Sequence, residues 1–300
     1  MLSKILSDTV VPVLFKIGPL KVYSYGLTVG IAFLVANYVA VKEFTRKGLG
    51  ADFANQVTIL AVVFGLVGSR ILSLIENWSD FLKDPIYMAV FAGGMTWYGG
   101  FILATLVVAW AIKRKGFRFF NVADALAPAL ILGYGVGRLA CHFSGDGDYG
   151  MPTNLPWGVD YAKGIDPPST AFRYLPKIEA RYPGGIVPDN TLVHPTPIYE
   201  FLACLIIFFV LWRLRKNMRT EGMLFMLYLV LEGAERLIVE FIRLNPRLLF
   251  GLTEAQLWSI PMIIVGVIGF LYLRSKPASL EPQLVNGKDQ RQAVAEHFRR

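Results

Sequence analysis

The chain has 300 residues, of which 54% are hydrophobic and 17% are charged. A soluble domain carries about 25% charged residues, so this composition, with its long apolar runs, excludes an ordinary soluble protein. The net charge of +8 does not indicate nucleic-acid binding, because the basic residues gather in short clusters between apolar runs, as membrane orientation requires.

The hydropathy pattern predicts an all-α integral membrane protein whose membrane domain covers residues 1–276. Each predicted span is close to the ~20 residues that cross the hydrocarbon core. The predicted transmembrane helices, seven in all, are residues 23–42, 54–75, 95–112, 119–143, 196–213, 222–243 and 255–274. A polar and basic tail follows at 277–300, and we expect it to be cytoplasmic and disordered.

Lys and Arg predict the orientation of these spans. The connections around 42–47, 113–118 and 213–219 are dense in basic residues, whereas the connections on the opposite side are sparse. Basic loops stay in the cytoplasm, so we expect a multi-pass protein of the cytoplasmic (inner) membrane with its N-terminus outside and its C-terminus cytoplasmic. The hydrophilic insertion 145–195 then lies outside and is expected to form a small extracytoplasmic cap.

Polar residues within the predicted spans fall mostly at one depth. Arg138 lies about a turn and a half from the outer end of the fourth span, in a glycine-rich stretch at 133–150. An arginine at membrane depth costs a few kcal/mol or more unless it is paired or faces a polar cavity. The residues expected near this level are Tyr25, Arg70, Tyr98, Arg138, His194, Tyr199, Glu200, Glu232, Glu235 and Arg236. The pattern predicts one polar cavity that opens to the outer leaflet and accepts an anion.

The sixth span leaves two interpretations open. Glu232, Arg236 and Glu240 are spaced by four and share one stripe of a helix, with Glu235 beside it. The carboxylates either neutralise Arg236 or contribute to ligand binding, and the two roles are compatible. A lone histidine such as His142 is usually a satisfied polar residue.

Several motifs in order resemble those of the prolipoprotein diacylglyceryl transferase family, over most of residues 17–274. The matching pieces are Ile17-Gly18-Pro19, Tyr25-Gly26-Leu27, Gly68-Ser69-Arg70, residues 93–100, Asp124, Ala127-Pro128, Gly135-Val136-Gly137-Arg138-Leu139, His194-Pro195, Tyr199-Glu200, residues 236–241 and Ser259-Ile260-Pro261-Met262. The piece around Arg138, which matches the start of the family's signature, is the most specific. Seven spans with an outside N-terminus are also the family's architecture.

The resemblance implies an activity. The family transfers the diacylglyceryl group of phosphatidylglycerol to the lipobox cysteine thiol of a prolipoprotein, forming a thioether and releasing glycerol phosphate. The implied partners are phosphatidylglycerol, prolipoprotein signal peptides and membrane lipid, without nucleic acid, cofactor or metal. Arg138 and Arg236 match family arginines that hold the lipid phosphate and stabilise the leaving group, and Tyr25 matches a tyrosine of the same site.

The chain departs from the family pattern at the proton acceptor. Tyr98 stands where a histidine is common, and tyrosine, with a pKa near ~10, is a poor base at neutral pH. We hypothesise that His142, Asp146 or Glu235 accepts the thiol proton. The alternative is that the thiol, with a pKa near ~8.5, ionises beside the paired arginines without a dedicated base. The expected catalytic residues are Arg138, Arg236, Tyr98, Tyr25 and His142. The expected substrate-binding residues are Arg138, Arg236, Arg70, Gly137, Cys141, Asp146, Glu235 and His194.

A second function class competes with the transferase. Intramembrane charges also mark transport paths, so a transporter or a non-catalytic lipid-binding relative is the alternative. Transporters often show repeated halves with broken helices near the midplane, and this chain shows no internal repeat. The two cysteines, Cys141 and Cys204, lie inside apolar runs, and with three scattered histidines they predict neither a disulfide framework nor a metal centre.

Overall fold

A computed structural model describes residues 2–90, 94, 96–173, 175–245 and 247–276. The chain is mostly helical, and a long helix overlaps each predicted span. These helices are α2 (Ser24–Arg46), α3 (Ala51–Glu76), α6 (Trp97–Arg114), α7 (Phe119–Ser144), α10 (Thr196–Leu214), α11 (Met223–Val239) and α12 (Glu254–Arg274). By length and apolar composition, α2, α3, α7, α10 and α12 qualify as membrane spans. The predicted tail 277–300 lies outside the described residues.

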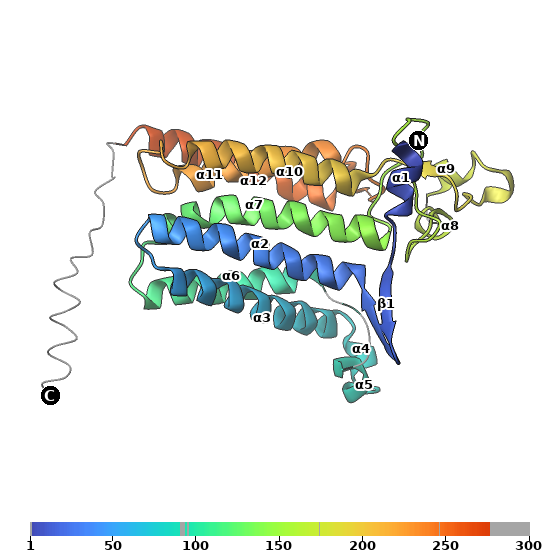
Figure 1. Ribbon diagram of the computed structural model, residues 1–300, viewed down its shortest axis with the longest axis horizontal. Coiled ribbons are helices and arrows are strands. Elements are labelled where there is room, and N and C mark those ends of the chain that lie inside the picture. Colours follow the sequence, from blue (N-terminus) through green and yellow to red (C-terminus); the bar gives the residue numbers. More distant parts are fainter. Residues whose placement is uncertain (1, 91–93, 95, 174, 246, 277–300) are drawn as a thin grey trace, which may run out of the picture. The chain divides into compact units, whose positions relative to one another are not determined.

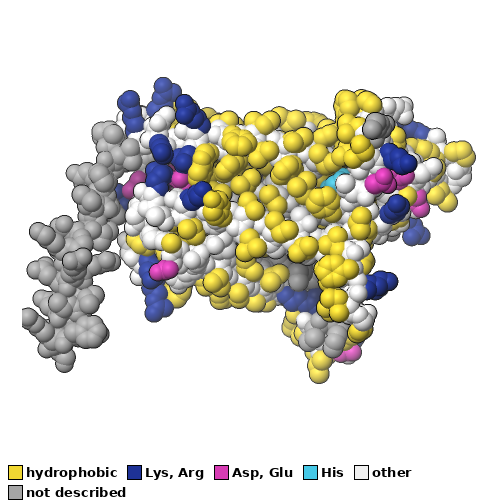
Figure 2. All heavy atoms as spheres, viewed as in Figure 1, with side chains coloured by type: hydrophobic (Ala, Val, Ile, Leu, Met, Phe, Trp, Pro, Cys, Tyr) yellow, Lys and Arg dark blue, Asp and Glu magenta, His cyan; other side chains and the backbone are white. Residues whose placement is uncertain are grey.

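The chain divides into two compact units. Among the described residues, the first holds those up to Ala36 together with those from Ala127 to residue 276, and the second holds Asn37–Leu126. Helices α2 and α7 contribute residues to both units. Many large apolar side chains on the helices are exposed, such as Ile206 and Phe209 on α10 and Ile268 on α12. Figure 2 shows hydrophobic side chains covering much of the helical surface, while Lys and Arg gather near helix ends, which suits a lipid environment.

The second unit is built on the packing of α3 against α6. A β-carbon at Gly68 would lie 2.3 Å from the carbonyl oxygen of Gly99, so only glycine permits this approach. Two short helices, α4 (Trp78–Phe81) and α5 (Pro85–Val90), follow α3.

The first unit sets α7, α10, α11 and α12 side by side (Figure 1). Close packing again depends on glycine, because a β-carbon at Gly135 of α7 would lie 2.6 Å from the β-carbon of Cys204 on α10. The buried core between these helices consists of Ala127, Ile131, Cys204, Ile207, Leu211 and Leu224. The interior near the ends of these helices carries the polar residues described below.

The insertion 145–195 folds into a small body at one end of the first unit. It contains β3 (Val159–Asp160), α8 (Pro168–Ala171), α9 (Pro176–Glu179), the 3-10 helix η1 (Pro183–Gly185) and β4 (Leu192–Val193), and β3 pairs antiparallel with β4. Helix α1 (Leu2–Asp8) contacts β3. Together they enclose a core of Val10, Tyr149, Val159, Tyr161, Phe172, Ile178, Val187 and Val193.

Two further antiparallel hairpins flank helices of this unit. Strand β1 (Val13–Ile17) pairs with β2 (Leu20–Tyr23) just before α2, and β5 (Arg247–Leu249) pairs with β6 (Leu252–Thr253) just before α12. Helix α12 begins with a capping box, in which Thr253 and Gln256 exchange side-chain and backbone hydrogen bonds. This cap fixes where the chain turns from the β5–β6 hairpin into the helix.

Candidate active site

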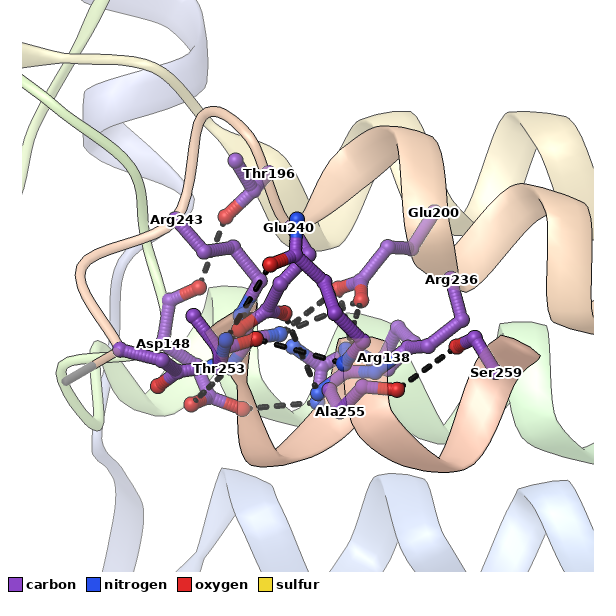
Figure 3. A network of polar contacts seen from close by, with 12 residues as sticks. Arg138, Asp148, Thr196, Glu200, Arg236, Glu240, Arg243, Thr253, Ala255 and Ser259 are labelled. Atoms are coloured by element: carbon purple, nitrogen blue, oxygen red, sulfur yellow. Dashed lines mark hydrogen bonds and ion pairs between the residues drawn. The ribbon is translucent and has the colours of Figure 1, made fainter. Parts of the chain in front are cut away.

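Glu200, near the start of α10, is the centre of a polar network in the first unit (Figure 3). Its side chain is 0% exposed. Nε of Arg138 on α7 donates to Glu200 Oε2 at 2.5 Å, and Nη1 of Arg236 on α11 donates to Oε1 at 2.7 Å. The two arginines therefore converge on one carboxylate. That a lipid phosphate binds at the same place stays a prediction.

A third arginine closes the network. Arg243, which follows α11 and is 4% exposed, donates through Nη1 to Glu200 Oε1 at 3.1 Å and through Nη2 to Asp148 Oδ1 at 2.5 Å. The other carboxylate oxygen of Asp148 lies 2.7 Å from Arg138 Nη1. Glu200, Arg138, Asp148 and Arg243 thus form a closed ring of alternating charge.

Helix α11 adds a further carboxylate. Glu240 Oε2 lies 3.6 Å from Arg236 Nη2 and 3.8 Å from Arg243 Nε. The sequence left open whether Glu232 and Glu235 neutralise Arg236. The ion pairs of Arg236 go to Glu200 and Glu240, so these two carboxylates already neutralise it.

Backbone contacts hold the loop after α7 against the start of α10 and the end of α11. Thr196 Oγ1 donates to the Asp148 carbonyl at 2.7 Å, and Gly150 forms a β-bridge with Arg243. A β-carbon at Gly150 would lie 2.7 Å from the Ile242 carbonyl oxygen, so this crossing requires glycine. These contacts fix the position from which the Asp148 side chain reaches both arginines.

The two aspartates of the loop have different acidities. Burial opposes ionisation of Asp148, but the charges of Arg138 and Arg243 outweigh it and lower the pKa of Asp148 to about 2. Burial, followed by the charge of Asp148, raises the pKa of Asp146 above its ordinary value. Asp148 is therefore an anion at neutral pH, whereas Asp146 holds its proton more readily.

Several buried polar atoms of the site have no hydrogen-bond partner among the described residues. They are Arg138 Nη2, Glu232 Oε2, both carboxylate oxygens of Glu235 and Glu240 Oε2. An unsatisfied buried donor or acceptor costs about 1–3 kcal/mol, and more when it is charged. Arg138 Nη2 in particular is a buried donor that an additional anion would satisfy.

Two groups of side chains are close enough to be considered as metal ligands. Cys141, Asp146 and Asp148 form one group, and Cys204, Glu232 and Glu235 form the other, with ligand atoms within 4.8 Å of one another in each. Each group offers three metal-ligand atoms, one fewer than a closed structural zinc site has. Cys141 Sγ accepts from Arg138 Nη1 at 3.4 Å, and Asp148 is engaged by two arginines, so the first group is already part of the ion-pair network.

His142 joins the end of α7 to Thr9 and to the insertion 145–195. Its side chain is almost fully buried, with Nε2 2.8 Å from Thr9 Oγ1 and Nδ1 2.8 Å from the Tyr161 hydroxyl. His194 lies 3.3 Å through Nδ1 from the hydroxyl of Tyr199, which accepts a hydrogen bond from Trp157 Nε1. Burial lowers the pKa of His194.

The remaining predicted site residues are divided between the two units. Tyr25, on the first turn of α2, is 45% exposed, and a β-carbon at Gly137 would meet nothing within 4 Å among the described residues. Arg70 and Tyr98 belong to the second unit. Arg70 donates to the carbonyls of Met88, Ala89 and Gly94, which ties it to the end of α5 and to Gly94 beyond it. The Tyr98 ring meets Trp97 edge-on, and positions 93 and 95 of the 93–100 motif lie outside the described residues.

The family model of the prolipoprotein diacylglyceryl transferases matches residues 12–272. The chain belongs to this family. The resemblance drawn from the sequence motifs is therefore confirmed, and the transferase signature around Arg138 lies where α7 enters the ion-pair network.

Curated relatives agree with the family assignment. The chain is 30% identical over 261 residues to a protein of Clostridium tetani (86% of this chain, 96% of the relative). It is 31% identical over 288 residues to one of Xylella fastidiosa strain M12 and 32% identical over 289 residues to one of Proteus mirabilis (each 90% of this chain, 95% of the relative). All three carry the name phosphatidylglycerol–prolipoprotein diacylglyceryl transferase.

Sequence reasoning missed part of this transferase-family site. Arg243 was treated as a loop charge that sets orientation. Glu200 was expected near the polar cavity and Glu240 on the polar stripe of the sixth span, but neither was among the expected catalytic or substrate-binding residues. Asp148 and Tyr134 were given no role, although the Tyr134 hydroxyl donates to Glu200 at 3.3 Å. One signal was available. Arg236, Glu240 and Arg243 are spaced by four and three, which continues the polar stripe of α11 beyond the helix end.

Proposed function

We propose that the chain transfers the diacylglyceryl group of phosphatidylglycerol to the lipobox cysteine thiol of prolipoproteins, forming a thioether and releasing glycerol phosphate. The single observation that carries the proposal is the convergence of Arg138, Arg236 and Arg243 on Glu200. Membership of the transferase family supports the class of reaction that we propose. The protein would work in the cytoplasmic membrane, with α6 and α11 completing seven spans, the N-terminus and cap outside, and the tail in the cytoplasm.

The arginines suit a phosphodiester substrate. Guanidinium groups bind phosphate oxygens through paired N–H donors and stay charged in apolar surroundings. In the reaction the cysteine sulfur forms a bond to the terminal carbon of the diacylglyceryl group, and the bond from that carbon to the phosphate oxygen breaks. The electron pair leaves with the phosphate, so fixed positive donors lower the barrier. The unsatisfied Nη2 of Arg138 supports a phosphate contact at this residue.

The thiol proton needs an acceptor, and we propose Asp146 among the three candidates. The pKa of Asp146 is raised by burial, so this carboxylate is more basic than an ordinary aspartate. A carboxylate oxygen of Asp146 lies within 4.8 Å of Cys141 Sγ, and Cys141 Sγ contacts Arg138. A carboxylate and a sulfur atom therefore fit together beside Arg138. His142 has partners at both nitrogens, and the oxygens of Glu235 are buried. We therefore assign His142 and Glu235 to positioning the site.

Asp146→Asn is expected to lower kcat by about 10²-fold, the contribution of a general base. A base must be ionised, so wild-type activity falls as the pH falls through the pKa of Asp146. The amide variant has no such group and loses this acid limb. The measurement is the pH profile of kcat/KM for thioether formation, with His142→Ala in parallel. If Asp146→Asn kept the wild-type profile while His142→Ala lost the acid limb, the proton acceptor would be His142.

The activity itself is tested by mixing the purified full chain with labelled phosphatidylglycerol and a lipobox peptide. We expect one thioether-linked diacylglyceryl peptide for each glycerol phosphate released, and no product with a peptide whose cysteine is replaced by serine. Retained binding of phosphatidylglycerol without thioether product would favour the non-catalytic lipid-binding alternative.

A further inference from the structure

Asp148 differs from the other carboxylates of the ion-pair network in the solvent exposure of its side chain. Its side chain is 35% exposed, whereas those of Glu200 and Glu240 are 0% exposed. Each of its two carboxylate oxygens binds a different arginine, at 2.7 Å from Arg138 and 2.5 Å from Arg243. Figure 3 shows Asp148 and Glu200 on either side of the guanidinium groups.

We propose that Asp148 holds the position of the lipid phosphate and that phosphatidylglycerol binds by displacing it. This inference rests on the proposed function and names how that site takes its substrate. A phosphodiester, like a carboxylate, presents two acceptor oxygens that match N–H donors from arginine. Asp148 is thus a specificity-determining and positioning residue that competes with the substrate.

The charges of the network require such an exchange. Three guanidinium groups, of Arg138, Arg236 and Arg243, are ion-paired with three carboxylates, those of Asp148, Glu200 and Glu240. A phosphate added to this set leaves one uncompensated negative charge in a largely buried site, which is costly. The charge balance is restored if one carboxylate rotates out of the network and faces water. Glu200 and Glu240 have no exposed surface, which leaves Asp148.

The local geometry permits the exchange without moving the chain. The Asp148 carbonyl is held by Thr196 Oγ1 at 2.7 Å, so the backbone stays in place while the side chain rotates about its own bonds. Arg138 remains held by Glu200, and Arg243 by Glu200 and Glu240. The donors released by Asp148, Arg138 Nη1 and Arg243 Nη2, then become available to the phosphate beside the unsatisfied Arg138 Nη2.

Competition predicts an effect that a purely structural ion pair does not. The apparent affinity of a ligand is reduced by the fraction of molecules in which the site is occupied by a competing group. Asp148→Asn removes the competing charge, so short-chain phosphatidylglycerol is expected to bind about tenfold tighter. The same variant loses two ion pairs and is expected to melt at a lower temperature without lipid.

The experiment titrates short-chain phosphatidylglycerol into the detergent-purified full chain by calorimetry, with thermal unfolding and the KM for phosphatidylglycerol measured alongside. Asp189→Asn is the matched control, because Asp189 is an exposed aspartate of the same insertion whose carboxylate accepts from the Ser169 amide and not from the arginines. Asp148→Ser serves as a second variant should Asp148→Asn fail to fold.

The expected result is tighter binding and a lower KM for the Asp148 variants, with the affinity of Asp189→Asn unchanged. Equal or weaker binding by the Asp148 variants would overturn the exchange, because a structural role predicts loss of stability and affinity together. An equal gain in Asp189→Asn would assign the effect to general surface charge and also overturn it. Failure of the wild type to bind phosphatidylglycerol would instead contradict the proposed function.

Discussion

Replacing Glu200 with Gln is expected to reduce thioether formation by about 10²-fold or more and to lower stability by about 3–5 kcal/mol. Glu200 is fully buried and accepts hydrogen bonds from Arg138, Arg236 and Arg243. The amide keeps the shape of the side chain but removes the charge, so three guanidinium groups face one another with one fewer counter-ion. The repulsion moves them away from the positions in which they bind a phosphate.

Two measurements check this expectation, thermal unfolding in detergent and the thioether assay. Glu254→Gln is the matched control, because Glu254 is exposed on the first turn of α12 and no buried ion pair depends on it. Its stability and activity are expected to stay close to those of the wild type. A Glu200→Gln variant that melted and reacted like Glu254→Gln would show that the arginines do not depend on this carboxylate.

Arg138→Lys is expected to reduce kcat/KM by about 10²–10³-fold, although the charge is kept. Arg138 uses Nε for Glu200 and Nη1 for Asp148 and Cys141, and retains Nη2 for a further acceptor. An ammonium group has three donors on one atom and cannot reach these separated partners at once. The geometry of the leaving phosphate is therefore lost, and we expect the decrease mainly in kcat.

Steady-state kinetics with phosphatidylglycerol as the varied substrate separate kcat from KM for this variant. Arg173→Lys, at an exposed arginine of the insertion 145–195, provides the control and is expected to react at the wild-type rate. Wild-type kcat/KM in Arg138→Lys would mean that a positive charge alone suffices at this position. The separated N–H donors of the guanidinium group would then not be needed for catalysis.

The positions of the long helices followed from the sequence, because membrane insertion leaves a strong signal in hydropathy. The helices were expected at nearly their observed positions, with α2 longer at its basic end, since Lys42 and Arg46 continue the helix beyond its apolar stretch. An ion-paired Arg138 was also expected, because a guanidinium group inside an apolar run must find a partner.

The rest of the site depends on contacts that a linear pattern does not carry. Asp148 lies in a polar insertion, where an aspartate looks like an ordinary loop residue. Arg243 is the last residue of a predicted span, where a basic residue looks like an orientation signal. Only the crossing of the loop after α7 over the end of α11, which Gly150 permits, brings them together. The partners of His142 also lie far from it in sequence, because Thr9 is 133 positions before it and Tyr161 is 19 positions after it.

A double-mutant cycle on Arg138 and Arg236 tests most directly whether the two arginines act on one lipid phosphate. The kcat/KM for thioether formation would be measured for the wild type, Arg138→Lys, Arg236→Lys and the double variant. We predict a coupling of about 1 kcal/mol or more, because the second substitution removes little once the shared phosphate site is already broken. Effects that add to within about 0.5 kcal/mol would contradict a shared site and place the two residues in separate roles.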